Sequence, residues 1–382
     1  MSNLSLPDTV YYDCSIINND QSATKKPPRI VFNDIRTIPI LTSPEQYQLS
    51  VIRFSLQCAN SLPIFIPFIQ INNVDEDPNL TTYSMTMTYN FNGEDNSSGQ
   101  VYIIHIPTNI AEPIPTLKTL EDVYNSDYYY VYSYNTIVDM LNKCLIDAFQ
   151  QLLNVANFNG INLPSNNVPY FEWDPDNSKF ILNGDSVSFD QRLPNHIKIH
   201  CNTALFTLIS SFDAFYNGAD VFEGKNYTFN IKSEPRGLNL YKITDTYSVI
   251  QLYQNYDCAS LFCPISSIVF STTTIPVLPS NIAKPQIIDG SGALTTSGIN
   301  NNISSMVTDF ESDGSPYAFN GTLSYLPQSE YRMIDLNNSS SEKLQNLDIA
   351  IYWKDQYSNL HPMYLYPSCS CDIKILFRKK KF

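Results

Sequence analysis

Residues 371–381 read CDIKILFRKKK, a run of alternating polar and apolar side chains that leads directly into four consecutive basic residues. The odd positions Cys371, Ile373, Ile375 and Phe377 fall on one face of an extended chain, as is typical of a strand that buries one side. Little sequence follows to cover such a strand, so we expect it to be paired within a sheet, with a free basic tail beyond it. The pattern favours a structural β protein over an enzyme.

The same alternation recurs along the chain, in Tyr83–Phe91, Tyr227–Ile231 and Leu347–Trp353. Strands that bury one face are typical of antiparallel sheets. Within Gln46–Leu56 the apolar positions change phase at Val51 and Ile52. A phase change inside one strand predicts a β-bulge or burial of both faces.

Two segments show helical rather than strand periodicity. Residues 137–152 carry apolar side chains at intervals of three and four, with Ser133 or Asn135 as the predicted N-cap, and Asn202–Phe212 is a weaker second helix. Residues 285–314 are rich in Gly, Ser and Asn and indicate a long loop or exposed excursion. We therefore predict an all-β protein in which 1–74 and 256–382 form one sandwich and 75–255 is an insertion with one or two helices.

Composition narrows the classes of function. The net charge of −14 argues against a nucleic-acid-binding body, and only 16% of the residues are charged. The 26 tyrosines and 21 phenylalanines suit extensive protein–protein contact. Eight cysteines are too few for a disulfide framework and are interpreted as reduced thiols. We expect neither a secretion signal nor a membrane span.

Candidate metal and catalytic motifs are weak. Cys369-Ser-Cys371 with Cys258 and Cys263 has poor zinc spacing. The loop from Asp174 to Asp185 lacks the glycine and the final glutamate of a calcium loop and is better read as a hairpin turn. His196 and His200 lack a zinc-protease motif, so structural roles are favoured. We expect no catalytic residue, metal or cofactor.

Two clusters remain as candidate contact sites. The first is a genome-facing basic tail, which could bind phosphate through counterion release or could simply keep an edge strand soluble: Lys374, Arg378, Lys379, Lys380 and Lys381. The second is a run of tyrosines that either recognises a surface glycan or packs into the insertion core: Tyr128, Tyr129, Tyr130, Tyr132 and Tyr134. Core packing is the favoured interpretation of the tyrosines.

Two outer stretches and the middle of the chain resemble a known family. Residues 29–71 (RIVFNDIRTIPILTSPEQYQLSVIRFSLQCANSLPIFIPFIQI) and 319–382 (from FNGTLSYLPQSEYRMIDL to CSCDIKILFRKKKF) are similar to the penton, or minor capsid, proteins of virophages and Polinton-like elements. The middle segments SYNTIVDMLNKCLIDAFQQL, PYFEWDPDNSKFIL and NHIKIHCNTALFTLISSF resemble the part that recurs between the outer parts of that family.

The resemblance implies a single jelly roll that assembles as a homopentamer at icosahedral vertices, with an outward-facing insertion. Its implied partners are the major capsid protein and other minor capsid proteins, in a virion assembled in the viral factory of the host cytoplasm. The residues expected in its core are Phe54, Phe65, Phe270, Trp353, Ile375 and Phe377. Alternatives are a carbohydrate-binding jelly-roll module for attachment to a host or giant virus and, less favoured, a glycan-processing enzyme.

Overall fold

The computed structural model divides the chain into two compact units. It describes residues 7–20, 27–57, 62–70, 77–107, 129–232, 242–243, 247–278, 286–288, 294–296, 305–311, 322–327, 332–337 and 342–381. Unit 1 comprises Met1–Pro63 and Pro264–Phe382, and unit 2 comprises Ile64–Cys263. The insertion expected from the sequence, 75–255, lies inside unit 2, which extends further at both ends.

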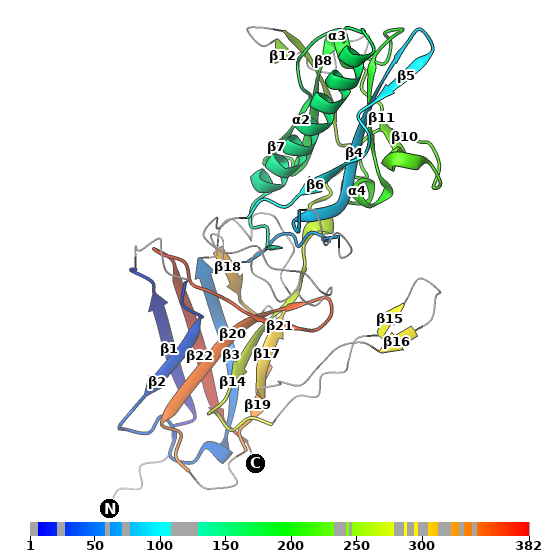
Figure 1. Cartoon of the computed structure of the whole chain (residues 1–382). Helices are drawn as coiled ribbons and strands as arrows, with labels where there is room; N and C mark the ends of the chain where they lie inside the picture. Colours follow the sequence, from blue (N-terminus) through cyan, green and yellow to red (C-terminus); the bar gives the residue numbers. More distant parts are fainter. Residues whose placement is uncertain are drawn as a thin grey trace, which may run out of the picture. The chain divides into compact units, whose positions relative to one another are not determined.

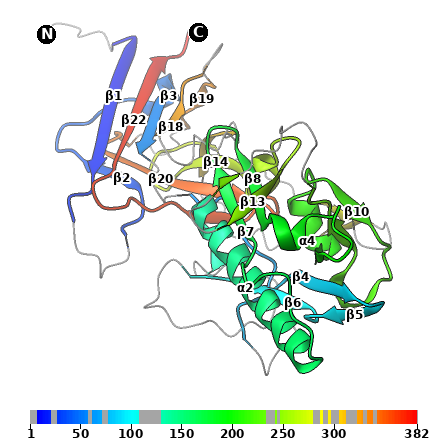
Figure 2. The ribbon, with the colours of Figure 1, turned by 90° about the horizontal axis from the view of Figure 1, so that it is seen from above.

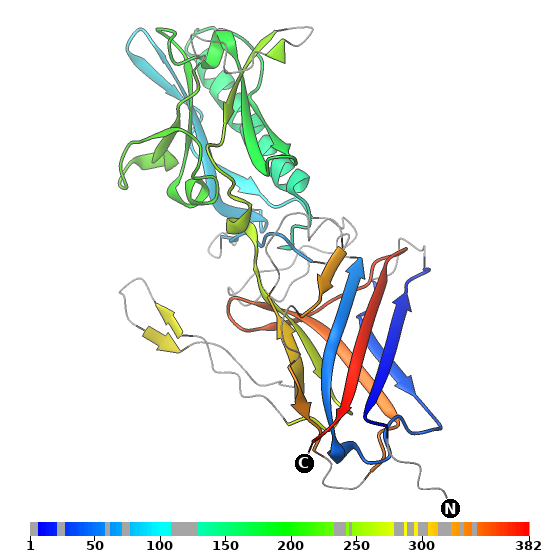
Figure 3. The same cartoon turned by 180° about the vertical axis from the view of Figure 1, so that it is seen from behind.

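Unit 1 contains two antiparallel sheets, which are seen from opposite sides in Figures 1 and 3. The first sheet has the order β1 (Thr9–Ile17), β22 (Ser370–Lys379), β3 (Tyr47–Gln57), β18 (Thr322–Tyr325), with β19 (Ile334–Asp335) also paired to β3. The second has the order β17 (Ser305–Phe310), β14 (Ile265–Thr272), β20 (Asn346–Asp355), β2 (Val31–Ile35), with β21 (Leu360–Pro362) also paired to β20. The remaining elements are η1 (Pro44–Gln46) and a separate hairpin of β15 (Gln286–Ile288) and β16 (Leu294–Thr296).

The order of these strands is that of a jelly roll. In the first sheet the last strand, β22, lies between β1 and β3, so the two ends of the chain share a sheet. Strands β2, β14, β17 and β20 form the second sheet, and the chain crosses between the sheets repeatedly. Two antiparallel sheets linked in this way form a jelly-roll sandwich. Unit 2 is the segment between β3 and β14.

The sandwich core is aromatic. The ring of Phe54 on β3 meets Phe270 on β14 edge-on at 5.0 Å, which joins the two sheets, and Phe270 stacks on Phe310 at 5.8 Å. Aromatic pairs of this kind add to the effect of burial alone. Trp353, Ile375 and Phe377 are likewise buried in unit 1. Phe65 is buried as well but belongs to unit 2, where its ring contacts Phe262 at 5.3 Å.

The phase change predicted in β3 is confirmed as a bulge. Lys374 pairs with Arg53, whereas the next residue of β22, Ile375, pairs with Val51, so the register shifts at Ile52. One extra residue on β3 moves the following side chains to the other face. Tyr47, Leu49 and Val51 can therefore be buried on the same sheet as Phe54 and Leu56.

Unit 2 also has two antiparallel sheets, with helices between and beside them. The larger sheet has the order β10 (Ala214–Tyr216), β11 (Tyr227–Phe229), β9 (Ile197–Cys201), β4 (Leu80–Phe91), β5 (Glu94–Ser97), with β6 (Val101–Ile104) on β4. The smaller has the order β12 (Lys242–Ile243), β13 (Ser248–Tyr253), β8 (Lys179–Asp185), β7 (Tyr170–Asp174). The helices are α2 (Tyr134–Phe158), α3 (Ser186–Phe189), α4 (Thr203–Leu208), η3 (Phe222–Gly224) and η4 (Ala259–Phe262).

The two predicted helices are present with side-chain caps. Ser133 accepts a hydrogen bond from the Thr136 amide at the start of α2, and Asn202 does the same for the Leu205 amide at α4. Helix α2 packs against β4, β6 and β7 (Figure 2). Helix α4 ends earlier than predicted, at Leu208. Strand β4 is buried on both faces rather than one, because η3 covers its polar side, where Thr86 donates to the Glu223 carbonyl at 2.6 Å.

A single carboxylate fixes the chain after β14. Asp348 on β20 accepts hydrogen bonds from the amides of Thr273 and Thr274, each at 2.8 Å, and from the hydroxyls of Thr272, Thr273 and Thr274. Partial burial acts to raise the pKa of Asp348, but these hydrogen bonds outweigh it and hold the pKa at about 2. The carboxylate therefore stays ionised at every pH at which the protein is expected to fold.

Replacing Asp348 with Ala should lower the free energy of unfolding of unit 1 by about 2 kcal/mol, because hydrogen bonds to a charged acceptor are lost. The wild-type contribution is fully present above the ordinary aspartate pKa of 3.8 and is lost as the pH falls toward about 2. The free energy of unfolding of unit 1 is measured by urea unfolding, followed by the fluorescence of Trp353 in a Trp173→Phe background. Asp34→Ala, which removes a partly exposed carboxylate paired with Arg36, is the control and should change little. If Asp348→Ala and Asp34→Ala lowered the free energy of unfolding equally, the hydrogen bonds from the threonines to Asp348 could not be the stabilising contact.

Candidate assembly surfaces

The outer face of the first sheet carries a small charge network built by β1, β3 and β22. Asp13 lies 3.2 Å from the Lys374 ammonium and 3.4 Å from the Arg53 guanidinium. Lys374 also lies over the ring of Tyr11, 5.5 Å from its centroid. Asp13 and Arg53 are about half exposed and Lys374 is partly exposed, so each ion pair contributes little to stability and mainly orients the side chains. Lys374 is therefore engaged within the chain.

The basic segment is held on the sheet as far as Lys380. The amides of Lys379 and Lys380 donate to the carbonyls of Asp8 and Gln46, at 2.8 and 2.7 Å. The Lys380 ammonium lies 3.4 Å from Asp335, whose pKa is lowered by a hydrogen bond from Gln48 and by Lys380. Expecting a free tail directly after the strand was therefore wrong. Arg378 and Lys381 are exposed, and Lys379 is partly so.

The tyrosine run lies mostly inside unit 2. Tyr129 and Tyr130 are 0% and 4% exposed, and Tyr134 stacks on Trp173 with ring centroids 4.0 Å apart. Tyr132 is half-buried and meets Tyr130 edge-on at 6.3 Å. Tyr128 lies outside the described residues. A surface-recognition role for Tyr129 and Tyr130 is thus incorrect, because their rings complete the interior packing.

The motifs that were weighed as metal sites have local hydrogen-bonding partners. Asp174 accepts bonds from Asp176 and Asn177 and closes the turn between β7 and β8. His200 lies between the hydroxyls of Thr88 and Thr228, 2.8 Å from each. Within the described ranges, no group of three or more His, Cys, Asp or Glu side chains has the arrangement of a metal site, and no helix is long and apolar enough to cross a membrane.

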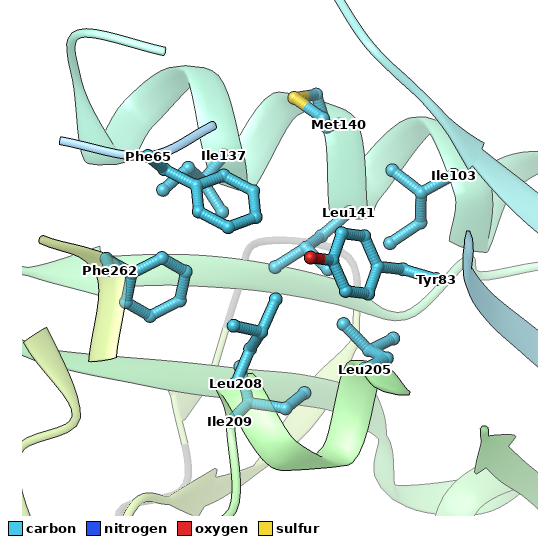
Figure 4. A pocket seen from close by; sticks show the side chains of 10 residues that line it. All are labelled: Phe65, Tyr83, Ile103, Ile137, Met140, Leu141, Leu205, Leu208, Ile209 and Phe262. Atoms are coloured by element: carbon cyan, nitrogen blue, oxygen red, sulfur yellow. The ribbon is translucent and has the colours of Figure 1, made fainter. Parts of the chain in front are cut away.

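An apolar cavity lies in unit 2 between α2, α4 and β4 (Figure 4). Its volume is about 20 Å³, close to the space that one water molecule needs. The Tyr83 hydroxyl points toward it among otherwise aliphatic and aromatic side chains. The cavity is far smaller than the clefts that bind sugars or drug-sized ligands.

Several large apolar side chains are exposed on and beside the strands β1 and β2. Ile35 and Ile38 are 74% and 78% exposed, and Ile17, Tyr11 and Val31 are also solvent-facing. Strand β2 is an edge strand that pairs with β20 on one side, with no described strand on the other. These exposed apolar side chains were not anticipated from the sequence. The sequence VFNDI of β2 places apolar residues on both faces of the strand, and this pattern could have indicated that some of them are exposed.

Comparisons with known proteins agree with this architecture. The family model of the Sputnik minor capsid protein V18/19 matches residues 10–379. An uncharacterized protein V18 of Sputnik virophage is 36% identical over 152 residues, which cover 38% of this chain and 85% of that protein. The structural protein V19 of Sputnik virophage is 24% identical over 221 residues, which cover 55% of this chain and 94% of that protein.

Solved structures extend the likeness over the whole chain. A chain of the cryo-EM structure of the Sputnik virophage superposes with a TM-score of 0.76 and 26% identity, covering 99% of this chain and 100% of that one. The crystal structure of the mavirus penton protein shares the fold, with a TM-score of 0.59 and 16% identity over 98% of this chain and all of that one. The match of the family model across both units shows that this chain belongs to the Sputnik minor capsid protein V18/19 family and is a structural protein of a virophage capsid.

Proposed function

We propose that the chain forms homopentamers that occupy the fivefold vertices of an icosahedral virophage capsid. The observation that carries this proposal is the jelly-roll sandwich, in which β1 and β18 end one sheet order and β17 and β2 end the other, with no further strand paired beyond them among the described residues. Five copies around an axis need head-to-tail contacts between two different surfaces. The β1–β2 edge and the opposite β17–β18 edge supply two such surfaces. The fold shared with the mavirus penton protein supports the same assignment.

In this proposal the two units have different roles. The jelly roll of unit 1 forms the wall of the vertex and contacts the major capsid protein around it, together with other minor capsid proteins. Unit 2, inserted between β3 and β14, faces outward. The inner-facing element is the C-terminal segment, in which the exposed Arg378 and Lys381 are better placed for weak contact with genomic DNA than the carboxylate-bound Lys374 and Lys380. Assembly takes place in the viral factory of the host cytoplasm.

Native mass spectrometry of the purified chain tests the proposal. We expect a dominant species of about 217 kDa, five times the 43.4 kDa chain mass. A fivefold stoichiometry is characteristic of an icosahedral vertex, because other symmetric assemblies favour two, three or four copies. A protein that remains monomeric, or that forms only dimers or trimers across the micromolar range, would contradict the vertex assignment.

A further inference from the structure

A short loop lies on the polar face of the larger sheet in unit 2. It connects β10 to β11, comprises residues 217–226 and contains η3. One end is held on β11, where the side chain of Asn217 donates a hydrogen bond to the Thr228 hydroxyl at 2.8 Å. Its middle is held on β4, where the Thr86 hydroxyl donates to the Glu223 carbonyl at 2.6 Å. The loop therefore passes over β9, the strand that lies between β4 and β11.

His200 of β9 lies beneath this 217–226 loop. It is the cross-strand partner of both Thr86 and Thr228, so the three side chains form one row on the same face of the sheet. The histidine is 6% exposed, and its ring nitrogens lie 2.8 Å from the hydroxyls of Thr88 and Thr228. The hydroxyl of Thr228 thus contacts the ring and also holds Asn217. The histidine and the loop belong to one hydrogen-bonded chain.

The 217–226 loop is closely packed on the sheet but strained. At Gly224 an added Cβ would lie 2.8 Å from the Ser84 hydroxyl oxygen and 2.9 Å from the Gln100 amide nitrogen. Glu223 has a φ of 59°, a left-handed conformation that is unfavourable for residues other than glycine. Its neighbour Phe222 is 88% exposed and gains little burial from the closed loop. Closure therefore depends mainly on the polar contacts with β4 and β11.

Protonation of His200 disfavours these polar contacts. A neutral imidazole has one nitrogen that donates and one that accepts, so one of the two threonine hydroxyls donates its hydrogen to the ring. After protonation both nitrogens donate, and that hydroxyl loses its acceptor in a buried position. Opening the loop would admit water, which can bond the hydroxyl and solvate the charged ring.

The charges around His200 act in the same direction. Burial is the main cause of its low pKa, and the cations of Lys225 in the loop and Lys198 on β9 lower the pKa further toward about 4. Asp95 on β5 opposes them. The carboxylate of Glu223 is already paired with Lys225 at 2.8 Å. A proton on the ring is therefore bound far more readily when the loop is open.

We propose that the 217–226 loop is an acid-sensitive switch, which leaves β4 and β11 when His200 takes up a proton while the rest of unit 2 stays folded. The surface that unit 2 presents then differs between neutral and acidic solution. The switch is a property of the single chain and does not depend on the proposed pentamer.

Hydrogen exchange of the full chain, measured by mass spectrometry, tests the switch. With the loop open, His200 titrates near its ordinary pKa of 6.5, so the open population should rise about 30-fold between about pH 7.5 and about pH 5. Protection factors, which are corrected for the intrinsic effect of pH on exchange, should fall by the same factor in peptides that cover the loop. The Asn217 amide, which donates to the Asn226 carbonyl at 2.8 Å, is one reporter. Peptides from the buried face of α2 should remain far more protected than the loop at both pH values, because they exchange through unfolding of the unit.

Substitutions identify the histidine that is responsible. His200→Gln keeps an amide that can bond both hydroxyls and removes the titration, so the protection of the loop should no longer depend on pH. His105→Gln is the matched control, because His105 is buried in the same unit with a similarly lowered pKa but follows β6, and it should keep the 30-fold change. Gly224→Ala should loosen the loop already at neutral pH.

Three results would overturn the switch. The first is a loop protection that is the same at neutral and acidic pH in the wild type, which needs no variant to observe. The second is a fall in protection that persists in His200→Gln. The third is an equal loss of protection in the loop and in α2, which would assign the change to unfolding of the whole unit.

Discussion

Lowering the pH from about 7.5 to about 5 is expected to destabilise unit 2 by roughly 4 kcal/mol, about 2 kcal/mol for each of two buried histidines. Burial lowers the pKa of both His105 and His200 from 6.5 to about 4. At His200 the nearby charges of Lys225 and Lys198 contribute to this lowering of the pKa, and Asp95 acts in the opposite direction. Both rings lie in unit 2, His105 just after β6 and His200 on β9.

The direction of the effect follows from which state binds protons. Unfolded histidines take up protons as the pH falls below about 6.5, while the folded rings stay neutral until about pH 4. The free energy of unfolding is therefore constant above pH 6.5, falls between 6.5 and 4, and levels off below 4 as far as these two groups are concerned. Carboxylates titrate mainly below this range. The change in the free energy of unfolding between pH 6.5 and 5 is therefore due mostly to the histidines.

The two tryptophans allow each unit to be followed separately. Trp173 lies on β7 of unit 2 and Trp353 on β20 of unit 1. In a Trp353→Phe background, urea unfolding monitored by fluorescence reports on unit 2 across the pH range. His200→Gln, whose amide can still bond the hydroxyls of Thr88 and Thr228, should remove about half of the pH dependence whatever its effect on absolute stability. A free energy of unfolding that stays flat from pH 7.5 to 5 would refute the prediction.

Strands with complete alternation could be predicted from sequence. In β20 every second residue from Leu347 to Asp355 is buried, because one face meets the sandwich core and the other meets solvent. Strand β22 follows the same pattern up to Ile375, and the phase change in β3 located its bulge. In each case the local pattern and the tertiary environment have the same period, so the sequence alone was sufficient.

Strand β17 could not be predicted in the same way. Ser305–Phe310 lies within the Gly-, Ser- and Asn-rich segment expected to be a loop, and only its two central residues are buried. It is an edge strand that pairs with β14 across a register shift at Phe270. Such a strand forms because it pairs with its neighbour, not because one of its faces is buried. Its own sequence therefore shows little of the alternation from which a strand is predicted.

The assembly surfaces depend on contacts between distant parts of the chain. Ile35 lies on the face of β2 opposite the buried Phe32, and which of these two faces is covered depends on where the other sheet packs, which the sequence of β2 alone does not encode. The clamp of Asp348 on Thr273 joins residues 75 positions apart. The buried tyrosines show the converse. Tyr129 resembles a recognition residue in composition and becomes interior only when distant segments, including Pro78 and His105, pack against it.

Replacing Trp353 with Ala should lower the free energy of unfolding of unit 1 by about 3–5 kcal/mol, the usual effect of removing a large buried aromatic side chain. Trp353 is 2% exposed and its ring stacks on His361 with centroids 4.0 Å apart and planes 17° apart. His361 in turn lies 2.9 Å from the Asp355 carboxylate, which also accepts the amides of Tyr357 and Asn359. Loss of the indole therefore leaves a cavity and admits water to this buried polar group.

Differential scanning calorimetry can separate the effect on the two units. The unit 1 transition of Trp353→Ala should fall by about 10 °C, since each kcal/mol lowers the melting temperature of a domain of this size by about 2–4 °C. The unit 2 transition should not move, because Trp353 lies in the core of the jelly roll. Tyr352→Ala, on the outward face of the same strand, is the matched control and should cost at most about 1 kcal/mol. If the two substitutions were equally mild, the indole could not be part of the interface between the two sheets, and the rigidity that a vertex wall requires would have to come from elsewhere in the sandwich.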